Sequence, residues 1–227
     1  MISENIRRIQ ERINSACRRK GRDPKEVTLV CVTKEASLND IIDAIGFGMR
    51  EVGENRVQDA LVKYKALQGK GLKWHMIGHL QTNKVKDALK IFDLIHSVDS
   101  VKLAKAIQSE AIKQNKLVDA LLEVNTSGES NKFGIEPEKF FGVLEDILKL
   151  SNVRVLGLMT MAPLVSNQEG ARPFFKKLKN MLNEANNKFD GLKLKCLSMG
   201  MTQDFEVAVE EGANIVRVGR AIFEGEV

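Results

Sequence analysis

The feature that most constrains the fold is a regular alternation of short apolar, β-branched runs with longer amphipathic stretches along the chain. Such runs are typical of strands, and apolar residues spaced at i, i+3 and i+4 are typical of helices. The runs predict strands at residues 27–33, 49–54, 73–78, 93–98, 118–126, 153–161, 192–200 and 213–223. The amphipathic stretches predict helices at residues 4–20, 38–48, 56–68, 83–91, 100–114, 137–150, 167–189 and 203–212.

This order of elements predicts an α/β fold, a single (β/α)₈ or TIM barrel with an extra N-terminal helix. The alternative is a doubly wound open sheet, which usually carries a glycine-rich turn after its first strand. The corresponding turn here reads "TKEAS" at residues 33–37 and contains no glycine, so the barrel is favoured. Because no Pro-, Gly- or Ser-rich linker divides the chain, we expect residues 1–227 to form one domain.

Composition and charge argue against several classes of protein. Residues 1–23 are charged throughout and no apolar run reaches membrane-spanning length, so we expect a cytoplasmic protein that does not enter a membrane. Cys17, Cys31 and Cys196 are widely separated, which favours neither a disulfide framework nor a zinc knuckle. The net charge of +5 suits an anionic ligand, but basic and acidic residues are interleaved and stacking aromatics are few, so no nucleic-acid partner is expected.

Polar residues follow each predicted strand, where a barrel of this kind gathers its functional groups. Lys34 follows the first strand, and it is either a solvated strand cap or an amine that forms a Schiff base with an aldehyde. The last two strands end in "SMGMT" and "RVGR", at the place where barrels bind phosphate. The strand ends therefore provide the groups needed to hold an anionic cofactor beside an amine.

Two other features have simpler explanations. His75 and His79 have the i, i+4 spacing of a zinc pair, but the segment is predicted as strand and loop and lacks the metalloprotease glutamate, so no metal is expected. His96 has no partner in the sequence that would make it a base. Tyr64, the only tyrosine, lies in a lysine-rich helical segment and is interpreted as a packed amphipathic residue.

The succession "VTK", "GENRVQDA", "WHMIGHLQTNK", "HSVDS", "VNTSGESNKFGI", "GLMTMAP", "LSMGMTQDFEVAVEEG" and "VRVGRAIF" extends in order from Val32 to Phe223. It closely resembles the pyridoxal 5′-phosphate (PLP) homeostasis protein family, which is similar to the N-terminal barrel of alanine racemase. The resemblance implies that Lys34 carries PLP as an internal aldimine. It also implies a phosphate cradle of Ser198, Thr202, Gly219 and Arg220, an arginine, Arg217, facing the pyridine nitrogen, and Asn55, His75 and Met159 around the ring. The chain departs from the family pattern at Thr202, usually serine, and at Glu224, usually glycine.

The function that the resemblance implies is PLP (vitamin B6) homeostasis, in which the protein buffers PLP or delivers it to PLP-dependent apoenzymes. We expect a monomer, because the barrel lacks the extra dimer-forming domain. Robust catalysis is not expected, because a racemase needs an acid or base on each face of its substrate. The resemblance implies that alanine racemase supplies the second acid or base as a tyrosine from an additional domain. A guanidinium at Arg217 also keeps its proton and leaves the pyridine nitrogen unprotonated. The alternatives are a PLP-dependent amino-acid racemase of low activity, with His75 and residues 125–134 on the substrate side, and an RNA- or partner-binding barrel.

Overall fold

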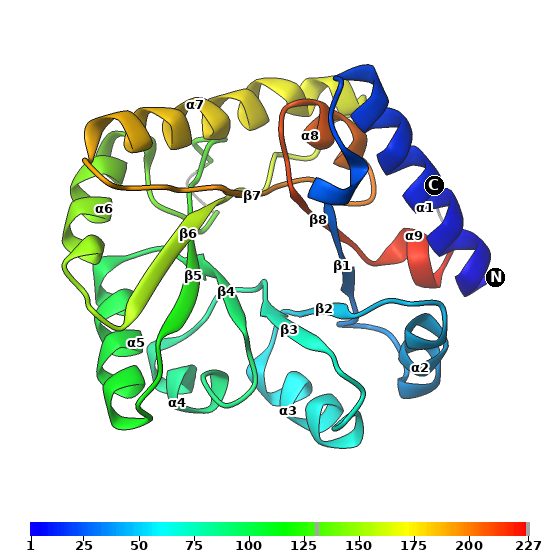
Figure 1. Cartoon of the computed structure of the whole chain (residues 1–227), viewed down its shortest axis with the longest axis horizontal. Helices are drawn as coiled ribbons and strands as arrows, with labels where there is room; N and C mark the ends of the chain where they lie inside the picture. Colours follow the sequence, from blue (N-terminus) through cyan, green and yellow to red (C-terminus); the bar gives the residue numbers. More distant parts are fainter. Residues whose placement is uncertain (130–131, 226–227) are drawn as a thin grey trace.

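Figure 1 shows the computed structural model, which describes residues 1–129 and 132–225. Its parallel strands close into a barrel in sequence order, and β8 pairs with β1. The prediction of a (β/α)₈ barrel is therefore confirmed. The strands are β1 (Thr28–Val32), β2 (Glu51–Glu54), β3 (Lys73–Met76), β4 (Leu94–Val98), β5 (Val118–Glu123), β6 (Val153–Met159), β7 (Cys196–Ser198) and β8 (Ile215–Val218).

Helices surround the ring of strands, and the predicted N-terminal helix α1 (Ile2–Arg19) lies beside the last helix (Figure 1). Asn5 Nδ2 donates a hydrogen bond of 2.9 Å to the Ile222 carbonyl, and Arg12 Nε lies 2.7 Å from Glu206 Oε1. The other helices are α2 (Leu38–Gly46), α3 (Val57–Ala66), α4 (Val85–Ala88), α5 (Val101–Lys113), α6 (Phe140–Leu148), α7 (Arg172–Lys188), α8 (Phe205–Glu210) and α9 (Arg220–Phe223). No helix in the described ranges is long and apolar enough to cross a membrane.

Two apolar layers hold the barrel together. The larger one lies between strands and helices, where Phe140, Phe175 and Phe205 are fully buried. The smaller one fills the barrel interior with Val30, Leu94, Leu121, Met159 and Ile215. Since both faces of the parallel strands are covered, β4 is buried at all its positions, the polar His96 and Ser97 included.

The structure corrects three predicted elements. The eighth strand ends at Val218, and the predicted continuation to residue 223 is helix α9. The seventh strand, predicted at residues 192–200, begins only at Cys196 and ends at Ser198. Before it, the backbone N–H and carbonyl of Leu194 form hydrogen bonds of 2.7 and 2.9 Å with the Asn186 side chain instead of with a neighbouring strand. The helix predicted at residues 83–91 is a 3₁₀ turn at Thr82–Lys84 followed by the short α4.

Candidate functional site

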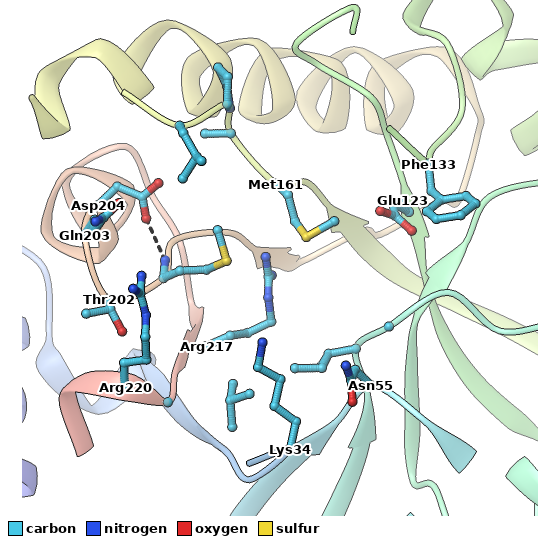
Figure 2. Close-up of a pocket in the computed structure, with 18 of the residues that line it drawn as sticks. Lys34, Asn55, Glu123, Phe133, Met161, Thr202, Gln203, Asp204, Arg217 and Arg220 are labelled. Carbon is cyan, nitrogen blue, oxygen red and sulfur yellow. Dashed lines mark hydrogen bonds between the residues drawn. The ribbon is translucent and has the colours of Figure 1, made fainter. Parts of the chain in front are cut away.

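A cavity of about 540 Å³ opens at the carboxyl-terminal ends of the strands, a size typical of small-molecule sites (Figure 2). The structure brings together there most of the residues predicted to bind a cofactor. The cavity is lined by Lys34, Asn55, Thr202, Arg217, Gly219 and Arg220. The other three, His75, Met159 and Ser198, are buried in the barrel interior and are not among the lining residues.

Lys34 extends its side chain into the cavity toward Arg217 (Figure 2). The side chain is 45% exposed, and its Nζ lies 3.6 Å from Glu35 Oε1. Its backbone position is fixed on both sides. Before it, Thr33 N donates to the Gly53 carbonyl over 3.0 Å, and after it Ser37 caps helix α2 through a capping box. The amine therefore stands on a rigid connection and remains accessible to a ligand.

A buried ion pair behind the cavity supports this connection. Glu54, the last residue of β2, is 0% exposed, and its Oε1 accepts hydrogen bonds from Lys63 Nζ at 2.8 Å and Thr33 Oγ1 at 2.6 Å. Lys63 Nζ also donates to the Thr33 carbonyl, directly before Lys34. Glu54 Oε2 has no hydrogen-bond partner among the described residues. The pair thus ties α3 to the backbone that carries Lys34.

Arg217 forms the floor of the cavity from β8 and is 4% exposed. Its Nη1 donates to Ser198 Oγ at 2.5 Å and its Nη2 to the Thr160 carbonyl at 3.0 Å. Burial lowers the pKa of Arg217 to about 10, against the opposing charges of Glu123 and Asp204, so the guanidinium is charged at neutral pH. Of its five N–H donors, those not used here form no hydrogen bond with the described residues, which leaves donors for a ligand.

The loop that follows β7 supplies donors on the other side of the cavity (Figure 2). Gly200 has φ +94° and a Cβ there would lie 2.6 Å from the Ala208 Cβ, so only glycine fits this turn. The backbone N–H groups of Thr202 and Gln203 donate no hydrogen bond within the described ranges. Together with the Thr202 hydroxyl and the guanidinium of Arg220, these groups suit a phosphate.

Two further glycines at the cavity wall allow close backbone packing. A Cβ at Gly219 would lie 3.0 Å from the Val32 carbonyl oxygen, which brings the β8 end against the β1 end. A Cβ at Gly78 would lie 2.4 Å from the Asn55 carbonyl oxygen. The positions of Asn55 and Arg220 at the cavity wall therefore depend on neighbours that have no side chain.

Sequence reasoning missed Glu123, which ends β5 and lines the cavity at 2% exposure. Burial raises its pKa to about 7, the charge of Asp99 adds to the rise, and Arg217 opposes it. Figure 2 places Glu123 near Phe133, across the cavity from Thr202 and Arg220. The signal in the sequence was an acidic residue at the end of the apolar stretch "ALL" and directly before Val124.

The two histidines of "HMIGH" lie in different parts of the barrel. His75 bonds to Glu51 and His96 inside the barrel, at 2.7 and 2.8 Å. His79 lines the cavity, where its Nδ1 lies 3.2 Å from Asp99 Oδ2 and its ring stacks on Phe133 at 4.0 Å. His96, for which the sequence offered no partner, bonds to both His75 and Ser198.

The geometry suits a ligand with three features. A phosphate fits the donors of the β7 and β8 ends, a ring acceptor fits the unused donors of Arg217, and an aldehyde fits the accessible amine of Lys34. PLP carries all three, so the residues present fit this cofactor.

Comparison with known proteins identifies the family to which the chain belongs. Residues 2–226 match the family described as "Alanine racemase, N-terminal domain". The chain is 46% identical over 220 residues to the pyridoxal phosphate homeostasis protein of Aquifex aeolicus, covering 97% of this chain and 96% of that one. It is 32% identical to the protein of the same name from Escherichia coli, covering 98% and 95%.

Solved structures agree with these similarities. PipY of Synechococcus elongatus, solved with PLP bound, superposes with a TM-score of 0.87 at 32% identity, covering 98% of this chain and all of that one. An alanine racemase of Clostridium difficile superposes with a TM-score of 0.72 at 14% identity, and the match covers 97% of this chain but 56% of the racemase. The racemase likeness shows the fold alone.

Proposed function

Because the chain belongs to the family of the alanine racemase N-terminal domain, we propose that it binds PLP through Lys34 and serves in the homeostasis of that cofactor. One observation carries the proposal: an accessible lysine amine, a buried arginine with unused donors and a phosphate-type loop line one cavity. The names of the similar proteins and the PLP in the PipY structure support it.

Each residue of the cavity has a role in this proposal. PLP supplies an electrophilic aldehyde and an electron-accepting ring when it is bound. Lys34 provides the amine that links to the aldehyde carbon, and Arg217 donates a hydrogen bond to the ring nitrogen. Thr202, Gly219 and Arg220 hold the phosphate, and Asn55 lies beside the ring. Ser198 orients Arg217, and the buried Met159 and His75 support the floor from below.

We propose that this binding is not coupled to rapid turnover of amino acids. Tyr64 is the only tyrosine of the chain, and its ring packs against Trp74 at a centroid distance of 5.6 Å instead of lining the cavity. A ring nitrogen that faces a permanently charged guanidinium stays unprotonated, which weakens the ring as an electron sink. The chain would therefore buffer PLP, or deliver it to PLP-dependent apoenzymes, as a cytoplasmic monomer.

The test is the visible absorption spectrum of the purified protein, recorded before and after addition of PLP. The wild type and Lys25→Ala should gain the band of lysine-bound PLP, because Lys25 is exposed at the opposite end of β1. Lys34→Ala should lack it. An equal band in Lys34→Ala, or none in a folded wild type, would contradict the proposal.

The alternative, a weak amino-acid racemase, predicts slow interconversion of D- and L-amino acids by the PLP-loaded wild type. Incubation with both enantiomers and chiral chromatography distinguishes it from the carrier. Transfer to an apoenzyme is measured separately, by the recovery of the apoenzyme's activity with loaded protein against an equal amount of free PLP.

A further inference from the structure

A continuous chain of hydrogen bonds crosses the barrel interior beneath the cavity, from Arg217 on β8 to Glu51 on β2. Ser198 Oγ lies 2.5 Å from Arg217 Nη1 and 2.9 Å from His96 Nδ1. His96 Nε2 lies 2.8 Å from His75 Nδ1, and His75 Nε2 lies 2.7 Å from Glu51 Oε2. Because Glu51 begins its strand and the cavity lies at the strand ends, the chain connects opposite ends of the barrel.

The two ends of the chain fix its direction. Arginine can only donate, so Ser198 Oγ accepts from Arg217 and has a single proton to donate onward. A carboxylate can only accept, so Glu51 accepts a hydrogen bond from His75 Nε2–H. Burial alone would raise the pKa of Glu51, but its hydrogen bond with His75 and the nearby Lys73 hold that pKa below the ordinary value. Glu51 is therefore ionised at neutral pH.

The interior of the chain satisfies every group only if both imidazoles are neutral. Ser198 O–H then donates to His96 Nδ1, His96 Nε2–H donates to His75 Nδ1, and His75 Nε2–H donates to Glu51. The reverse direction needs a charged His75 and leaves the Ser198 hydroxyl proton without an acceptor among the described residues. His96 is fully buried, and burial is the largest cause that keeps its pKa well below the ordinary value. The neutral arrangement is therefore favoured.

We propose that this chain is a one-way relay that holds Arg217 in place, which makes Glu51 and the two histidines positioning residues for the PLP site. The proposal rests on the function proposed above, because it gives Arg217 its task at the ring. Arg217 has two protein acceptors, and the Thr160 carbonyl, held in the backbone, cannot by itself fix the rotation of the guanidinium. Ser198 can serve as the second acceptor only while its own proton is directed away, toward His96.

The direction of the chain is tested by ¹⁵N NMR of the histidine rings in the PLP-free protein. The sequence contains three histidines, so His79→Gln leaves only the signals of His75 and His96. Both are expected as neutral Nε2–H tautomers at neutral pH. An Nδ1–H tautomer or an imidazolium form for either ring would overturn the relay.

The coupling to the cofactor is tested by spectroscopic PLP titrations of Glu51 variants. Glu51→Leu removes the terminal acceptor and should weaken binding roughly three- to tenfold, the range of one neutral hydrogen bond. Glu51→Gln keeps an acceptor oxygen and should restore most of the affinity. Lys73→Met removes the charge beside Glu51 but keeps the acceptor, and because Lys73 is 68% exposed and lies 3.5 Å from the other oxygen of Glu51, it should weaken binding less than Glu51→Leu. Wild-type affinity in Glu51→Leu, or equal losses in the Leu and Gln variants, would contradict the proposal.

Failure of the relay is distinguishable from failure of the proposed function. If wild type binds no PLP, the proposed function fails, and the titrations no longer support the positioning role, whatever the tautomers are. If wild type binds PLP and Glu51→Leu, folded by its thermal unfolding curve, binds it equally well, only the relay is wrong.

Discussion

Replacing Lys63 by methionine should destabilise the barrel far more than replacement of a surface lysine. The Lys63 side chain is 13% exposed and pairs with Glu54, which is 0% exposed. Without the ammonium, Glu54 keeps one hydrogen bond, from Thr33 Oγ1, and its second oxygen already has no partner among the described residues. The Thr33 carbonyl also loses a donor.

The expected loss follows from the cost of an uncompensated buried charge. Removing one member of a buried ion pair typically costs about 3 to 5 kcal/mol of unfolding free energy. For a chain of this length each kcal/mol lowers the melting temperature by about 2 to 4 °C, so Lys63→Met should melt roughly 6 to 20 °C lower. The same change should weaken PLP binding, because Lys63 holds the carbonyl that precedes Lys34.

Thermal and urea unfolding of the PLP-free protein measure this loss without ligand stabilisation. Lys65→Met is the matched control, since Lys65 is exposed on the same helix. The double variant Glu54→Leu, Lys63→Met removes both charges and should recover much of the stability. A loss below about 1 kcal/mol in Lys63→Met, or a double variant less stable than the single one, would refute the reasoning.

Three further predictions concern stability. Gly157→Ala should cost several kcal/mol of unfolding free energy, because a Cβ there would lie 1.9 Å from the Cys196 carbonyl oxygen. Gly142 is exposed in a helix, so Gly142→Ala should stabilise the protein by about 0.5 to 1 kcal/mol. Urea unfolding measures both changes. Because burial raises the pKa of Glu123 to about 7, its carboxyl favours the folded state below about pH 4.5 and loses that contribution as pH rises through 7. The free energy of unfolding of the wild type, relative to that of Glu123→Gln, should fall by about 3 kcal/mol across that window. A difference between the two proteins that stays constant with pH would contradict this prediction. Ser37→Ala should cost about 1 kcal/mol through loss of the capping box, with PLP affinity retained, and a large loss of affinity would contradict the local role.

The barrel could be predicted from the sequence because each strand is covered on both faces. Apolar runs such as Leu29–Cys31, buried throughout, stand out against the amphipathic helices between them. Strand ends then locate the cavity, which is why Lys34 and the "SMGMT" and "RVGR" segments could be assigned to one site. The helix at Arg220–Phe223 was missed because four residues are too few to show a helical period, and its apolar residues follow closely after the strand.

The polar interior was beyond sequence reasoning because its partners are distant along the chain. His96 meets His75, 21 residues away, and Ser198, 102 residues away, so periodicity cannot indicate either contact. The same holds for Glu54, which is fully buried and bonds to Thr33, 21 residues away, and to Lys63. Such pairs are set by strand order and register, which only the folded barrel defines.

Peptide mapping after borohydride reduction of the PLP-loaded protein shows directly which lysine carries the cofactor. Reduction makes the link between a lysine amine and PLP permanent, so the modified peptide identifies the lysine. We expect one stoichiometric phosphopyridoxyl group, on the peptide containing Lys34. Modification spread over exposed lysines, or located on another residue while Lys34 remains unmodified, would contradict it.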